Sequence, residues 1–139
     1  MAGVSEMAIG MLLAALVAQD LALVTADAAD PVAIAARLDL TSFPNSTAPR
    51  RRDGLRTFAD YGFTSVVRDG NAAVLDAADK SWTFRVSILD RSDKAMKLCI
   101  LDRALNGGSY FSVKPIEVAQ GKDGLFRATG NSVADPNCA

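Results

Sequence analysis

The chain has 139 residues, half of them hydrophobic, with 15 basic and 16 acidic side chains and no histidine. This length suits one domain, and the near-neutral charge indicates neither a nucleic-acid partner nor an anionic membrane surface. The missing histidine excludes a Ser-His or Cys-His nucleophile pair and any histidine-ligated metal. Two cysteines are too few for a thiolate zinc site. We therefore expect no metal site and no cofactor.

The first 28 residues have the pattern of a secretory signal peptide. An apolar run over 7–18 is too short to cross a bilayer comfortably, and small residues over 24–28 offer a cleavage site. The segment is atypical because it carries Glu6 near its start and no basic residue. The alternative is an uncleaved N-terminal helix that anchors the protein in a membrane or packs against a partner. With cleavage, the protein is secreted or periplasmic, and residues 29–139 form a single β-rich domain.

A short helix and a long loop are expected before the sheet. Asp30 suits the N-cap of a helix and Pro31 its first position, which predicts a helix over 31–38. Residues 41–54 contain two prolines, three consecutive arginines and no hydrophobic period. They predict a loop that is long for so small a domain.

From residue 64 onward apolar and polar residues alternate, as they do in strands with one buried face. Strands are expected over residues 64–69, 72–75, 81–89, 96–100, 109–118 and 125–129. Short turns between them predict an antiparallel meander, because such turns cannot make parallel crossovers. The expected fold class is α+β, with one or two short N-terminal helices packed on a twisted antiparallel sheet of five to six strands; a small closed β-barrel is the alternative. The expected core comprises Trp82, Phe84, Val86, Ile88, Met96, Leu98 and Ile100.

The two cysteines are the natural candidates for a cross-link. Cys99 lies in the middle of an expected strand, and Cys138 is the penultimate residue. Because cysteines of exported proteins are usually paired, we predict a disulfide that ties the polar tail to the sheet. Without export, the alternative is a buried thiol at Cys99 and an exposed thiol at Cys138.

Three consecutive arginines form the densest charge in the chain. Arg50, Arg51 and Arg52 could grip a phosphate, sulfate or carboxylate, since guanidinium groups suit planar oxyanions. They could equally form a protease-sensitive site or contact acidic envelope polymers. A solvated loop without a ligand is the simpler interpretation.

The outward surface of the sheet is a second candidate binding face. Arg85, Lys97 and Tyr110 fall at positions that could share this surface. The simpler interpretation is that they merely cover the second face of the sheet or pack under a helix.

Two turn-forming segments carry a resemblance to a known family. Asn106-Gly-Gly-Ser-Tyr110, followed by Gln120-Gly-Lys122, resembles sequence in small periplasmic lysozyme inhibitors. Those proteins are also β-rich, exported and disulfide-bridged. The matched segments lack the tryptophan expected of that family, and the resemblance assigns no functional residue.

Carboxylates are the remaining route to catalysis. Asp76 and Asp79 share one turn, and Asp90 and Asp93 bracket another, but aspartate favours turns because it caps the local backbone. No loop has the calcium-binding pattern. The sequence therefore predicts a small exported, non-catalytic binding or inhibitory module that acts on an unknown protein or envelope polymer. The alternative is a structural or accessory subunit of an envelope complex, held by an uncleaved N-terminal helix.

Overall fold

The computed structural model describes residues 30–139, and the leader predicted over 1–28 lies outside them. In the described part, a six-residue helix, α2 (Pro31–Ala36), precedes an antiparallel sheet of six strands. The strands are β1 (Ser65–Asp69), β2 (Ala72–Asp76), β3 (Trp82–Arg91), β4 (Met96–Ala104), β5 (Phe111–Gln120) and β6 (Phe126–Ala128). They lie in sequence order across the sheet, which confirms the predicted meander. The sheet is open, with β1 and β6 at its edges, so the alternative of a closed barrel is wrong.

One face of the sheet carries the core, as the alternation of apolar residues predicts. The middle of the expected core is buried and comprises Phe84, Val86, Leu98 and Ile100. The three residues nearer the strand ends are half-buried and pack against this cluster, namely Trp82, Ile88 and Met96. The core therefore thins toward the rim of the sheet, where side chains remain accessible.

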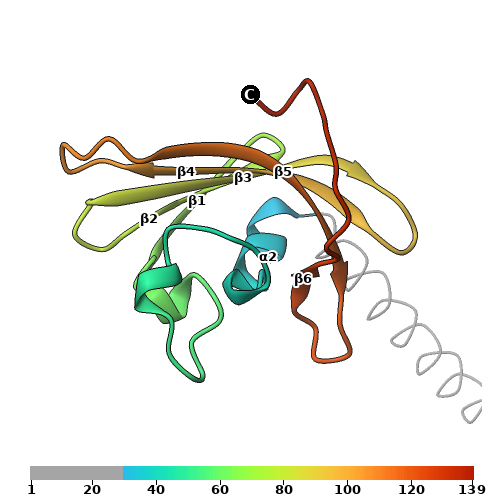
Figure 1. Cartoon of the computed structure of the whole chain (residues 1–139), viewed down its shortest axis with the longest axis horizontal. Helices are drawn as coiled ribbons and strands as arrows, with labels where there is room; N and C mark the ends of the chain where they lie inside the picture. Colours follow the sequence, from blue (N-terminus) through green and yellow to red (C-terminus); the bar gives the residue numbers. More distant parts are fainter. Residues whose placement is uncertain (1–29) are drawn as a thin grey trace, which may run out of the picture. The chain divides into compact units, whose positions relative to one another are not determined.

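Three phenylalanines fill the space beneath the sheet. Phe58 and Phe63 flank the 3₁₀ turn η3 (Ala59–Tyr61), and Phe84 reaches them from β3. Their rings meet edge to face, with centroids 4.9 to 5.6 Å apart, which is the favoured geometry for aromatic pairs. The segment before β1 and the helix α2 thus cover the same face of the sheet (Figure 1).

The loop predicted over 41–54 has an interior of its own. Two 3₁₀ turns order it, η1 (Leu40–Ser42) and η2 (Ala48–Arg50), and Phe43 between them is buried. The side chain of Asn45 hydrogen-bonds three backbone groups of the loop. Packing by its own side chains is typical of a compact Ω-like loop, and it fixes the backbone that carries the arginines.

The C-terminal tail is tied to the outer face of the sheet. Cys99 on β4 and Cys138 form the predicted disulfide. Lys97, two residues earlier on β4, makes an ion pair with Asp135 of the tail at 3.6 Å. Both β4 residues alternate with buried Leu98, so the tail lies on the side opposite α2 (Figure 1). The disulfide is consistent with an oxidising extracellular or periplasmic location.

Candidate functional site

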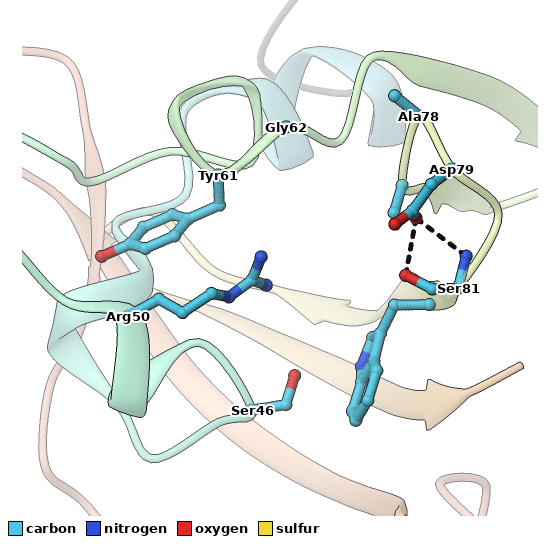
Figure 2. Close-up of a pocket in the computed structure, with 9 residues that line it drawn as sticks. Ser46, Arg50, Tyr61, Gly62, Ala78, Asp79 and Ser81 are labelled. Carbon is cyan, nitrogen blue, oxygen red and sulfur yellow. Dashed lines mark hydrogen bonds between the residues drawn. The ribbon is translucent and has the colours of Figure 1, made fainter. Parts of the chain in front are cut away.

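A hollow of about 370 Å³ opens between the 41–54 loop, η3 and the turn from β2 to β3 (Figure 2). Its polar and aromatic lining comprises Ser46, Arg50, Tyr61, Asp79, Ser81 and Trp82. We refer to this hollow as the Arg50 pocket. Its size lies within the range of small-ligand sites, and it combines aromatic walls with a few polar groups, as such sites do.

Arg50 supplies the positive charge of the pocket. Its guanidinium group points into the hollow, toward the space between Tyr61 and Asp79 (Figure 2). The Cζ atom lies 6.0 Å from the centroid of the Tyr61 ring, within the range of a cation–π interaction. Within residues 30–139, no side chain or backbone oxygen lies within ion-pair or hydrogen-bond distance of this guanidinium, although its charge contributes to lowering the pKa of Asp79 across the pocket. Its donors are therefore available to an acidic group that enters the pocket.

Asp79 supplies a negative charge on the opposite wall. Its Oδ1 accepts hydrogen bonds from the backbone nitrogen and the hydroxyl of Ser81, at 3.0 and 2.6 Å (Figure 2). These bonds lower the pKa of Asp79, so the carboxylate is ionised at neutral pH. Lys80, between the two residues, has a φ of 60°, which closes the tight turn that holds them. The pocket thus presents fixed charges of both signs.

Asp102 hydrogen-bonds two residues that line the pocket, Ser46 and Trp82. This carboxylate on β4 is 2% exposed and accepts three hydrogen bonds. Ser46 donates to it from its backbone nitrogen at 2.8 Å and from its hydroxyl at 2.6 Å, and Trp82 donates from Nε1 at 2.6 Å. Tyr110 packs on Trp82 with ring centroids 5.5 Å apart, and burial and the Asp102 charge raise the pKa of Tyr110. Asp102 therefore joins the loop to the sheet where the pocket opens.

Replacing Asp102 with asparagine should lower the free energy of unfolding by about 2–3 kcal/mol. Hydrogen bonds to a charged acceptor contribute about 1.5–3 kcal/mol each, and the new amide nitrogen would face donors. Urea denaturation followed by the fluorescence of Trp82, the only tryptophan, measures the loss. The control Ser46→Ala leaves the carboxylate and its bond to Trp82, and it should cost about 1 kcal/mol. Equal losses for the two variants would contradict the central role of Asp102.

The three arginines predicted as one binding group face different surroundings. Arg50 enters the pocket, whereas Arg51 donates from Nη2 to two backbone oxygens of its own loop, at 3.2 and 3.0 Å. Arg52 lines a separate hollow of about 420 Å³, together with Arg51 and Arg56. Arg51 therefore holds the loop closed and separates two cationic side chains that the sequence places together.

The structure does not bring Arg85, Lys97 and Tyr110 onto one surface. Arg85 lies on the outer face and pairs with Asp69 of β1 at 2.8 Å, while Lys97 is engaged by the tail. Tyr110 packs against Trp82 on the core side of the sheet. The two cations are already paired, and the tyrosine belongs to the rim of the Arg50 pocket.

Sequence reasoning missed most of this site. The sequence predicts a turn residue at Asp79 and a core residue at Trp82, and it does not mark Ser46 as part of a pocket. Asp102 did carry one, because it continues the alternation of the buried residues Leu98 and Ile100. An aspartate at a buried strand position needs partners, which marks the strand end as a polar site.

Comparison with known proteins adds no assignment. No family model, curated protein or solved structure matches the chain. Among residues 30–139, no cluster of three or more acidic or cysteine side chains could hold a metal ion. The same span contains no helix long and apolar enough to cross a membrane. The fold and the pocket define a small protein with an open antiparallel sheet and a charged, aromatic hollow at its rim.

Proposed function

We propose that this protein is a small exported binding module that takes an acidic group of a protein or envelope polymer into the Arg50 pocket. The observation that carries this proposal is the guanidinium of Arg50, which has no ion-pair or hydrogen-bond partner within residues 30–139 and lies beside Tyr61. Guanidinium groups bind carboxylates and phosphates through paired, charge-assisted hydrogen bonds. The half-buried Trp82 offers an apolar surface to the rest of the ligand.

The chemistry of the pocket favours binding over catalysis. Asp79 is the carboxylate that lines it, and the hydrogen bonds from Ser81 lower its pKa. A general acid or base works best with a pKa near the working pH, so a carboxyl group with a lowered pKa is a poor proton carrier at neutral pH. Asp79 is better suited to orient a ligand. Its charge repels the acidic group of the ligand toward Arg50 and attracts a hydrogen-bond donor of the ligand.

Two features support export. The leader pattern over residues 1–28 is typical of a signal peptide, and the Cys99–Cys138 disulfide persists in oxidising compartments. In such a location the ligand is an extracellular or periplasmic protein or a polymer of the cell envelope.

Arg50→Ala should weaken the binding of acidic ligands at least about tenfold, because it removes charge-assisted hydrogen bonds worth about 1.5–3 kcal/mol. Trp82 lines the pocket and is the only tryptophan, so its fluorescence reports occupancy directly. Suitable probes are a glutamate hexapeptide and a linear polyuronate, each titrated at constant ionic strength. Arg52→Ala is the matched control, because it removes the same charge from the neighbouring hollow and should change affinity less than about twofold.

Either of two results would contradict the proposal. One is the absence of a saturable fluorescence change with both probes. The other is an equal loss of affinity in Arg50→Ala and Arg52→Ala, which would indicate general charge attraction without a specific pocket.

A further inference from the structure

The two edges of the sheet differ in their backbone hydrogen bonding. The β6 edge is closed, because Phe126 donates its N–H to the carbonyl of Arg37 at 2.8 Å and accepts from the N–H of Asp39 at 2.9 Å. At the β1 edge, no strand or segment of residues 30–139 pairs with the outer side. All five β1 residues are exposed, and Val67 is 59% exposed. An open edge with exposed β-branched residues is a template for another strand.

The register of β1 determines which of its backbone groups are unpaired. Gly70, with a φ of 59°, opens a two-residue turn, so Asp69 and Ala72 face each other as a hydrogen-bonded pair. Such pairs alternate along an antiparallel ladder, and Val67 is therefore bonded to β2 in the same way. The N–H and C=O groups of Val66 and Arg68 point away from the sheet.

We infer that β1 pairs with β1 of a second copy of this chain, antiparallel about a two-fold axis at Val67. In this register Val66 of each copy faces Arg68 of the other copy. The unpaired backbone groups of both strands then meet, and each facing pair exchanges both of its hydrogen bonds. The result is one continuous sheet that spans both copies, formed by strand addition.

The side chains of β1 suit pairing with themselves. On the outer face, Val67 of one copy faces Val67 of the other. The Ser65 hydroxyl of each copy faces the Asp69 carboxylate of the other, and Arg85 already neutralises this carboxylate at 2.8 Å. A shift of one residue would oppose outer-face and inner-face side chains. Moving the axis to Arg68 would place two arginines opposite each other, which is destabilising. Moving the axis to Val66 would pair only the first three residues of β1. The register centred on Val67 is therefore the most favourable one.

Sedimentation velocity of the protein expressed from the full chain should reveal a reversible monomer–dimer equilibrium. Val67→Lys places two like charges at the two-fold axis and should raise the dissociation constant at least about tenfold. Phe111→Lys is the matched control, because it adds the same charge at a 60% exposed position of β5, away from this edge. It should leave the equilibrium unchanged.

A charge-swap experiment separates this interface from any other. Val67→Glu alone should weaken the dimer as Val67→Lys does, whereas an equimolar mixture of the two variants should form a mixed dimer, because opposite charges meet at the axis. Thermal unfolding confirms that each variant is folded. A wild-type protein that stays monomeric at every concentration overturns the inference, as do a dimer that Val67→Lys leaves intact and a mixture that does not associate.

Discussion

Replacing Asp39 with alanine should lower the free energy of unfolding by about 3 kcal/mol, because it removes a buried acceptor of charge-assisted hydrogen bonds that contribute about 1.5–3 kcal/mol each. Asp39 is 1% exposed and caps η1. It accepts hydrogen bonds from the backbone and hydroxyl of Thr41 at 2.9 and 2.6 Å. It also pairs with Arg56 at 3.2 Å and with Arg127 of β6 at 3.0 Å. The variant leaves all of these donors without their acceptor.

The matched control for Asp39 is the second carboxylate that binds the same arginine. Asp123 contacts Arg127 at 2.6 Å, but its carboxylate is half-exposed whereas that of Asp39 is buried, so Asp123→Ala should cause a much smaller loss. Urea denaturation of the wild type, Asp39→Ala and Asp123→Ala under identical conditions compares their free energies of unfolding. Equal losses for the two variants would mean that burial adds nothing to the interaction of Asp39 with Arg127.

The same two carboxylates predict how stability depends on pH. Burial raises the pKa of Asp39, but hydrogen bonds from Thr41 and Arg127 and the charge of Arg56 outweigh it, and the net shift is downward. Hydrogen bonds from Arg127 lower the pKa of Asp123 to about 2. Because both values lie below the unfolded value of 3.8, the stabilisation is complete above about pH 4 and is lost as the pH falls toward 2. Asp39→Ala should reduce this acid dependence.

The strands could be predicted because the alternation of apolar and polar residues that marks them lies within each short segment of sequence. In β3 and β4 every second residue enters one core, and the alternation states this directly in the sequence. The extent of burial is not local, since Trp82 and Met96 obey the same alternation and yet lie at the thin rim of the core. Their exposure depends on how far the segments packed on the core face extend, which requires the tertiary structure.

The candidate site could not be predicted because it depends on the path of the loop backbone. Arg50, Arg51 and Arg52 are the same residue type in succession, but Arg50 enters one pocket, whereas Arg51 and Arg52 line another and Arg51 also closes the loop. Their different roles arise from the turns that Asn45 and the buried Phe43 impose.

Two buried carboxylates link the stability of the protein to the shape of its pocket. Asp102 fastens Ser46 to the sheet, and Asp39 fastens the other end of the loop through Arg56. Arg50 lies on the segment between these two attachments. Loss of either carboxylate should therefore loosen the Arg50 pocket as well as the fold, which makes ligand affinity a sensitive readout for both variants.

Removing the disulfide in a Cys99→Ala, Cys138→Ala double variant should lower the free energy of unfolding by about 4 kcal/mol, from the chain entropy released by a bridge of this span. The two residues are 39 positions apart, so the bridge restrains β4, β5 and β6 in the unfolded chain. Urea denaturation should also give a steeper slope, because the unbridged chain exposes more surface on unfolding. Circular dichroism of the folded variant should retain the sheet signal.

The tail itself provides the control for this prediction. Asp135→Ala removes the ion pair with Lys97 but keeps the disulfide, and it should cost about 1 kcal/mol or less. If the double variant lost no more than Asp135→Ala, the bridge would stabilise only the local attachment of the tail. A loss of several kcal/mol with a steeper slope would instead place the effect in the unfolded state, where a cross-link between a central strand and the chain end restricts the most conformations.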